Sequence, residues 1–253
     1  MKFLRDTWLV YQRSMLLNLK QPVWLVVMLV QPLYFLILFA PLLNGFESMP
    51  GFENGAMETF VPGLIIMMAL FGSTFVGFGL IAELKEGIIE RMRVTPVSRA
   101  ALSAGRVLQT VSTTVVQALV LVLLSAPIAG LTIHWKGLGM MLLIVVLVAF
   151  LLGSVSYALA IILRSEDALA PVVNTVVQPV MLLSGIMLPM ALAPNWLQTV
   201  ADFNPFYYAV EAARSLFAGD LSDPTIWQAG VFLGGLMLLA MFWSTRKFSK
   251  AAA

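Results

Sequence analysis

Charge is what this sequence has least of. Only 11% of its 253 residues are charged, whereas 60% are hydrophobic. Soluble domains carry about 25% charged residues, because water must solvate their surface. A chain with so few charges cannot cover itself in this way, so the composition predicts a protein whose solvent is mostly lipid.

Cysteine is absent, and histidine occurs once, as His134. Without cysteine the chain has no disulfide framework and no thiolate metal site, and one histidine cannot assemble a multi-histidine site. We interpret His134 as an interfacial polar residue beside Trp135. The sequence also lacks a GxxxxGK[ST] phosphate loop, so it does not bind ATP by that route.

Residues 1–20 are amphipathic if they are helical. Apolar and aromatic residues recur at spacings of three or four and are interspersed with bases: Phe3, Leu4, Trp8, Tyr11 and Met15 with Lys2, Arg5, Arg13 and Lys20. No small-residue cleavage site follows, which argues against a signal peptide. We predict a surface helix in the cytoplasmic headgroup region; the alternative is a frayed basic tail.

Long uncharged segments follow, and six of them are predicted to span the membrane: 23–43, 60–82, 107–133, 137–163, 168–188 and 226–245. At ~1.5 Å per residue each is long enough to cross roughly 30 Å of hydrocarbon. Pro32 and Pro41 are expected to bend or end the first. Residues 189–223 are predicted to form an external segment, broken by Pro189 and Pro194, with a short helix after Asn204-Pro205.

Six spans place both termini on one side of the membrane. If the N-terminus, residues 83–106, the turn at Arg164 and the C-terminus are cytoplasmic, thirteen of the 15 bases lie inside. Lys136 and Arg214 alone lie outside. Cytoplasmic loops are enriched in lysine and arginine, so this distribution supports the six-span topology.

Residues 83–106, which we call the elbow, form the longest strongly charged passage. They contain three acids and five bases: Glu83, Glu86, Glu90, Lys85, Arg91, Arg93, Arg99 and Arg106. A short helix is predicted over 86–94, with the acids spaced by three and four on one stripe. Thr95-Pro96 should end it, and Ser98 can cap the next helix. The elbow is either a solvated loop or a short rigid element that binds in a basic groove on a partner protein.

Five amide side chains interrupt the otherwise apolar spans: Gln31, Gln109, Gln117, Asn174 and Gln178. They could line a weakly polar path between two chains, or form helix–helix hydrogen bonds worth ~0.6 kcal/mol each. The aromatic residues Phe75, Phe78, Phe150 and Tyr157 could suit a lipid-like substrate, or could be packing alone. We expect no buried ion pair in the spans, which argues against coupling to an ion gradient.

The elbow sequence ELKEGIIERMRVTPVSRAALSAGR closely resembles the loop between spans two and three of type-2 ABC exporter permeases, a family that includes daunorubicin-type drug efflux and polysaccharide export permeases. The passage NPFYYAVEAAR, residues 204–214, resembles that family's segment between spans five and six. Ile88-Ile89 departs from the threonine-containing step common in the family.

The resemblance implies an all-α polytopic fold in which two permease chains, expected to be a homodimer, pack around a path. Two copies of a separate ATP-binding subunit, carrying ATP and Mg, would grip the elbow. Its contact residues would be Glu83, Lys85, Glu86, Glu90, Arg91 and Arg93, with Thr95-Pro96 as the stop. Residues 191–218 would form two short re-entrant helices.

The leading hypothesis is therefore the membrane subunit of an ATP-driven exporter of a hydrophobic drug, lipid or glycolipid. It would lie in a bacterial or archaeal plasma membrane, contact lipid, bind no nucleic acid and hold no cofactor itself. Polysaccharide export is an alternative. An ion-coupled transporter and a membrane-embedded enzyme are also considered, the latter using Asp202, Glu211 and Arg214.

Overall fold

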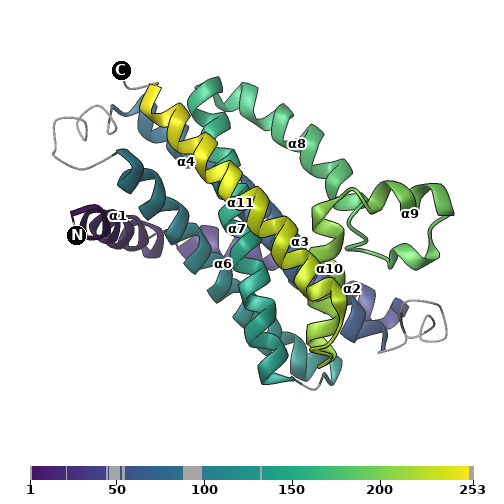
Figure 1. Ribbon diagram of the computed structural model, residues 1–253. Helices are drawn as coiled ribbons and strands as arrows, with labels where there is room; N and C mark the ends of the chain where they lie inside the picture. Colours follow the sequence, from purple (N-terminus) through teal and green to yellow (C-terminus); the bar gives the residue numbers. More distant parts are fainter. Residues whose placement is uncertain are drawn as a thin grey trace.

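A computed structural model describes residues 2–20, 22–43, 45, 52, 55–87, 99–131 and 133–250, and no strand occurs among them. The helices in chain order are α1 (Lys2–Leu19), α2 (Pro22–Leu43), α3 (Ala56–Thr74), α4 (Val76–Lys85), α6 (Arg99–Ala129), α7 (Trp135–Leu163), α8 (Glu166–Leu182), the short 3-10 helix η1 (Met190–Leu192), α9 (Asn195–Ala201), α10 (Pro205–Phe217) and α11 (Pro224–Lys250) (Figure 1). The described part of the chain is thus all-α, as predicted.

Helix α7 lies at the centre of the bundle and packs against α3, α4, α6, α10 and α11. On the face that it turns to these helices, side chains such as Met141, Val145 and Val148 are completely buried. Close packing also depends on Gly137 in its first turn, because a Cβ there would overlap the carbonyl oxygen of Leu216 in α10. Glycine allows the two backbones to meet.

Helices α3 and α4 form one crossing that is interrupted at Phe75. Ser156 of α7 satisfies the interruption: its hydroxyl donates to the Thr74 carbonyl at 2.5 Å and accepts from the Gly77 N–H at 2.9 Å. Inside a membrane every backbone polar group needs a partner. A single serine on the neighbouring helix therefore provides partners for two backbone groups at the interruption.

Within the described residues, five helical segments are long and apolar enough to cross a membrane: Val26–Leu43, Ala56–Lys85, Ala101–Pro127, Trp135–Leu163 and Pro224–Arg246. These segments support a polytopic membrane protein. Helix α8, where a further span was predicted, has 17 residues, which gives a length of ~26 Å. By length alone it falls just short of the others.

Several local predictions can be compared with these bounds. Helix α2 continues through Pro32 and ends at Leu43, two residues after Pro41. Helix α10 begins at Pro205, where the short helix was predicted. Helix α6 begins at Arg99, eight residues before the predicted span. Glu86 and Gly87 form a turn after α4; the rest of the helix predicted over 86–94, together with Thr95-Pro96, lies outside the described residues.

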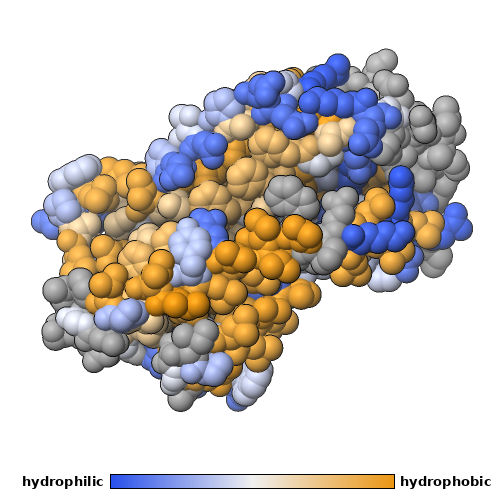
Figure 2. Space-filling view, turned by 180° about the vertical axis from the view of Figure 1, so that it is seen from behind, coloured by the Kyte–Doolittle hydropathy of each residue, from blue (hydrophilic) through white to orange (hydrophobic). Residues whose placement is uncertain are grey.

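The bundle has two distinct ends. Both termini and the end of α4 lie at the left of Figure 1; we call this the elbow end. Helices α9 and α10 lie toward the opposite end, which we call the Arg214 end because Arg214 belongs to α10. The reverse face has a broad hydrophobic surface across its middle, with much of the hydrophilic colour along its upper edge (Figure 2).

Candidate functional site

At the elbow end, Arg106 of α6 forms an ion pair with Glu83 of α4. The Arg106 side chain is only 8% exposed and that of Glu83 27%. The guanidinium also interacts with the hydroxyl of Tyr157 in α7. The prediction that the spans hold no buried ion pair is therefore corrected: α6 starts earlier than predicted, so both partners lie within apolar helical segments.

A second ion pair joins the elbow to the next cytoplasmic turn of the predicted topology. Lys85 Nζ lies 2.9 Å from Glu166 Oε1, and both side chains are substantially exposed. Glu86, directly after α4, is exposed. Of the elbow residues assigned to partner contact, Glu83 and Lys85 are thus engaged within the chain. Glu90, Arg91, Arg93, Thr95 and Pro96 lie outside the described residues.

A cleft of about 820 Å³ opens beside the Glu83–Arg106 pair, between α1, α2, α3, α4, α6, α7 and the start of α8. Two of the predicted path amides, Gln109 and Gln117, lie on its wall. The aromatic residues Phe75, Phe78 and Tyr157 also line it. The structure thus gathers part of the predicted substrate path within one chain.

The other three predicted path amides lie elsewhere. Gln31 is exposed on α2. Asn174 and Gln178 share an exposed face of α8, whereas Leu169, Val173 and Val177 on the same helix are buried. None of the three lines the cleft.

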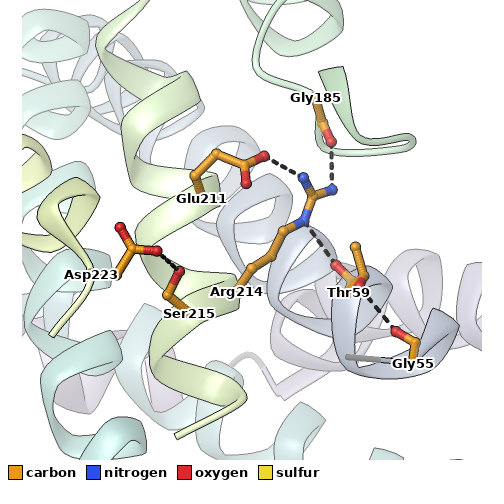
Figure 3. Close-up of polar contacts among 7 residues, drawn as sticks. All are labelled: Gly55, Thr59, Gly185, Glu211, Arg214, Ser215 and Asp223. Atoms are coloured by element: carbon orange, nitrogen blue, oxygen red, sulfur yellow. Dashed lines mark hydrogen bonds and ion pairs between the residues drawn. The ribbon is translucent and has the colours of Figure 1, made fainter. Parts of the chain in front are cut away.

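At the opposite end, Arg214 of α10 binds two other segments of the chain and a carboxylate on its own helix (Figure 3). Its Nε donates to the Thr59 carbonyl of α3 at 3.0 Å, and one terminal nitrogen donates to the Gly185 carbonyl at 2.7 Å. The other terminal nitrogen pairs with Glu211 at 2.6 Å. Arg214 is 7% exposed, so this hub is buried.

Asn204 and Asp223 cap the helices on either side of the hub. Asn204 Oδ1 accepts from the Phe206 N–H at 3.1 Å, and its Nδ2 donates to the Val180 carbonyl at 2.8 Å. Asp223 accepts from the Thr225 N–H at 2.8 Å and from the Ser215 hydroxyl at 2.5 Å. Burial acts to raise the pKa of Asp223, but these hydrogen bonds outweigh it and hold the pKa below its ordinary value.

The residues weighed for an enzyme do not form a reactive cluster. Glu211 and Arg214 are paired with each other, and Asp202 is exposed at the end of α9. Tyr207 lies nearby, and its burial and the negative charge of Glu211 raise the pKa of its hydroxyl. Among the described residues, no three histidine, aspartate or glutamate side chains gather as a metal site.

The sequence matches the family described as "ABC-2 type transporter" over residues 5–218. This match spans most of the chain. The chain belongs to the ABC-2 type transporter family. The resemblance of the elbow to type-2 ABC permeases is thereby confirmed.

Several curated relatives of this ABC-2 permease are named as permeases. The daunorubicin resistance ABC transporter permease protein DrrB1 of Streptomyces coeruleorubidus is 24% identical over 223 residues, covering 87% of this chain and 77% of the relative. The probable doxorubicin resistance ABC transporter permease protein DrrC of Mycobacterium tuberculosis is 27% identical over 215 residues, covering 80% and 75%. A putative transport permease, ycf38 of Cyanophora paradoxa, is 24% identical over 221 residues, covering 85% and 75%.

These findings assign the chain to a class. It is a multi-pass membrane permease, a transport subunit rather than an enzyme, and its family implies an ATP-binding ABC partner protein. Within this permease, sequence reasoning identified neither the Glu83–Arg106 pair nor the Arg214 hub. The spacing of Glu211 and Arg214 by three residues on one helix was the available signal for the second. Glu83 and Arg106 are 23 positions apart, and no periodicity indicates such a pair.

Proposed function

We propose that this permease is the membrane subunit of an ATP-driven exporter that moves a hydrophobic drug, lipid or glycolipid out of the cytoplasm or inner leaflet. ATP and Mg are held by a separate ATP-binding subunit, present in two copies, and two identical permease chains form the membrane part. The single observation that carries this proposal is the ABC-2 family match over residues 5–218. The names of DrrB1 and DrrC support a drug as cargo.

The proposal includes six crossings, with α8 as the fifth. Its support is the pair of contacts made at the two ends of α8. Glu166 at its start pairs with Lys85 at the end of α4, and Gly185 just beyond it accepts from Arg214, which also binds Thr59 near the start of α3. The chain from 166 to 185 therefore reaches both ends of the crossing formed by α3 and α4. Six crossings leave both termini in the cytoplasm of a bacterial or archaeal cell.

The absence of cysteine permits a direct test of this topology. Asp167→Cys and Asp202→Cys place single thiols at exposed positions, the first in the first turn of α8 and the second beyond its C-terminal end. In intact cells, a membrane-impermeant maleimide should label Asp202→Cys, whereas Asp167→Cys should react only after the cells are opened. Equal labelling of both from one side would show that α8 does not cross.

Docking of the ATP-binding subunit is assigned to the elbow, with Glu86 as the accessible contact among the described residues. Glu83 and Lys85 are engaged in ion pairs inside the chain, whereas Glu86 is exposed at the tip of α4. We therefore assign Glu83 and Lys85 to holding the elbow in place through their ion pairs with Arg106 and Glu166. Glu90, Arg91 and Arg93, with Thr95-Pro96 as the stop, extend the proposed contact.

The docking proposal is tested by charge reversal. Glu86→Lys should reduce co-purification of the GxxxxGK[ST]-containing partner at least severalfold, because it replaces a carboxylate with a base that a basic groove repels. Asp202→Lys is the matched control, since it makes the same kind of change at the Arg214 end. Undiminished association of Glu86→Lys, or an equal loss with Asp202→Lys, would remove Glu86 from the docking contact.

The substrate path is proposed to lie between the two chains, where Asn174 and Gln178 offer a polar strip. Both amides lie on the face of α8 turned away from its own bundle, so a second chain can approach them. Gln31 is exposed on α2 and is available in the same way. Replacing Asn174 and Gln178 together with leucine should change efflux while leaving partner association intact. Unchanged efflux would exclude this strip from the path.

A further inference from the structure

The wall that α6 contributes to the cleft has an unusual composition for a membrane helix. Five polar residues follow one another at spacings of one and three, and all line the cleft: Gln109, Thr110, Thr113, Thr114 and Gln117. They lie within the apolar segment Ala101–Pro127. Polar side chains in hydrocarbon need hydrogen-bonding partners. The chemistry of the cleft therefore depends on which of these donors and acceptors already have a partner within the protein.

Internal hydrogen bonds engage three of their donors and leave oxygen atoms that can still accept. The hydroxyls of Thr110 and Thr113 donate to the carbonyls four residues earlier, at 3.2 and 3.0 Å. Thr113 Oγ1 in turn accepts from Gln109 at 3.1 Å and from Asn18 of α1 at 3.2 Å. A threonine hydroxyl has one donor and two acceptor sites. Thr113 is thus saturated, whereas Thr110 still offers acceptor lone pairs toward the cleft, suited to a ligand with hydroxyl or N–H groups.

Helices α1, α2 and α4 add apolar residues to the lining. They include Leu17, Met28 and Phe78, with Phe75 directly before α4, and the rings of Phe75 and Phe78 lie 5.5 Å apart. Gly72 and Gly79 also line the cleft, and a Cβ built on either would meet nothing within 4 Å. These two glycines therefore leave space that the protein itself does not fill.

The charges at the end of the cleft cancel one another. Glu83 is paired with Arg106, and Glu166, which also borders the cleft, is paired with Lys85. An occupant therefore needs no net charge. From Arg106 to Gln117 the polar strip runs ~16 Å along α6. The volume of about 820 Å³ lies within the range of roughly 300–1,000 Å³ for small-molecule pockets.

We propose that this cleft binds one elongated amphiphile of no net charge, with hydroxyl or amide groups along the α6 strip and a hydrocarbon or aromatic face against Phe75 and Phe78. The site lies within a single chain and is separate from the path proposed between two chains. Residues of α1 close one side of it, so the bound molecule also joins the surface helix to the bundle. Such an amphiphile has two sources, the bilayer and the transported cargo.

Photolabelling of the full chain in phosphatidylcholine vesicles tests the proposal. One probe is a diacylglycerol with a diazirine in one acyl chain, and the other is a photoreactive dihydroxyanthraquinone. At least one should label peptides from 56–87 or 99–131. Labelling by the diacylglycerol assigns the site to a bilayer lipid, and labelling by the anthraquinone alone assigns it to cargo-like molecules. A matched phosphatidate probe, which carries a charged head, should label at least fivefold less than the diacylglycerol.

Two variants separate specific binding from general exposure to lipid. Gly79→Leu fills the empty space and should lower labelling at least tenfold. Gly139→Leu is its control, because Gly139 is also unobstructed but does not line the cleft. The double variant Thr110→Val/Thr114→Val keeps the shape and should lower labelling at least threefold. No labelling by either probe, equal labelling of Gly79→Leu and Gly139→Leu, or full labelling by phosphatidate would overturn the proposal. None of these measurements requires ATP or transport.

Discussion

The two ends of this permease differ in the kind of bond that connects their helices. At the elbow end, side chains pair with side chains, in Glu83–Arg106 and Lys85–Glu166. At the Arg214 end, side chains also bind the backbone: besides its pair with Glu211, Arg214 donates to two main-chain carbonyls, and Asn204 donates to a third. The first kind of bond joins flexible side-chain tips, whereas the second holds the chain itself.

This difference has a mechanical consequence. A main-chain carbonyl cannot change partner unless its segment moves, so the Arg214 hub fixes α3, α10 and the chain around Gly185 relative to one another. Long side chains in an ion pair can follow small helix displacements by changing rotamer. We therefore expect the elbow end to tolerate rearrangement and the Arg214 end to resist it. Each of the following predictions tests that contrast.

The largest effect is expected from Arg214→Ala. The substitution removes three hydrogen bonds and leaves the Glu211 carboxylate and two carbonyls without these partners. Breaking a buried ion pair by removing one partner typically costs about 3–5 kcal/mol. The free energy of unfolding in detergent, followed by tryptophan fluorescence, should fall by that amount. Arg214→Lys keeps the charge but not the planar set of donors, so it should lose less. A loss below about 1 kcal/mol for Arg214→Ala would contradict the hub.

Arg106→Gln should have a smaller effect, about 1–3 kcal/mol. Glu83 and Glu211 are similarly exposed, but Arg214 also binds two main-chain carbonyls, which its loss leaves without these partners. Charge exchange then distinguishes the two ends. The double variant Glu83→Arg/Arg106→Glu should recover part of the stability lost in Arg106→Glu, because a pair of side chains can be reversed. Glu211→Arg/Arg214→Glu should recover little, since carbonyl oxygens accept no bond from a carboxylate. Equal recovery at both ends would remove the distinction.

The helical architecture was largely accessible from sequence because hydropathy reports it directly. Uncharged runs mark where backbone groups must pair within a helix, and Asn204-Pro205 is a typical start of a helix, with an amide cap followed by proline. The start of α6 was harder to locate. Hydropathy places charged Arg106 outside the membrane segment, whereas Glu83 neutralises it and allows the helix to continue.

The candidate site was accessible only in part. The unusual amides Gln109 and Gln117 were identified from composition, but their separation from Gln31, Asn174 and Gln178 depends on how the helices rotate against each other. The role of Ser156 at the interruption between α3 and α4 depends on contact across 79 to 82 residues of sequence. Periodicity describes one helix at a time and cannot report such contacts.

At the Arg214 end, the stabilising effect of the Asp223 carboxylate should depend on pH. Its pKa in the folded protein lies below the ordinary value of 3.8, so its stabilising effect is present above that value and is lost as pH falls through the lower, folded pKa. Asp223→Ala should cost about 0.5–2 kcal/mol at pH 7, as for a helix cap. The difference from wild type should shrink as the pH approaches 3. Asp202→Ala, an exposed carboxylate at the same end, is the control. A difference independent of pH would show that the carboxylate charge is not what stabilises this cap.

The smallest effect is expected for the exposed pair at the elbow end. Lys85→Ala should change the free energy of unfolding by about 0–1 kcal/mol, because exposed ion pairs lose much of their attraction to water and to side-chain entropy. That small difference should also decrease between 50 mM and 1 M salt, as counter-ions screen the charges. The loss in Arg214→Ala should barely depend on salt, since its bonds are buried. If Lys85→Ala were as costly and as independent of salt as Arg214→Ala, the elbow would be held as rigidly as the opposite end, and the expected contrast in mobility would fail.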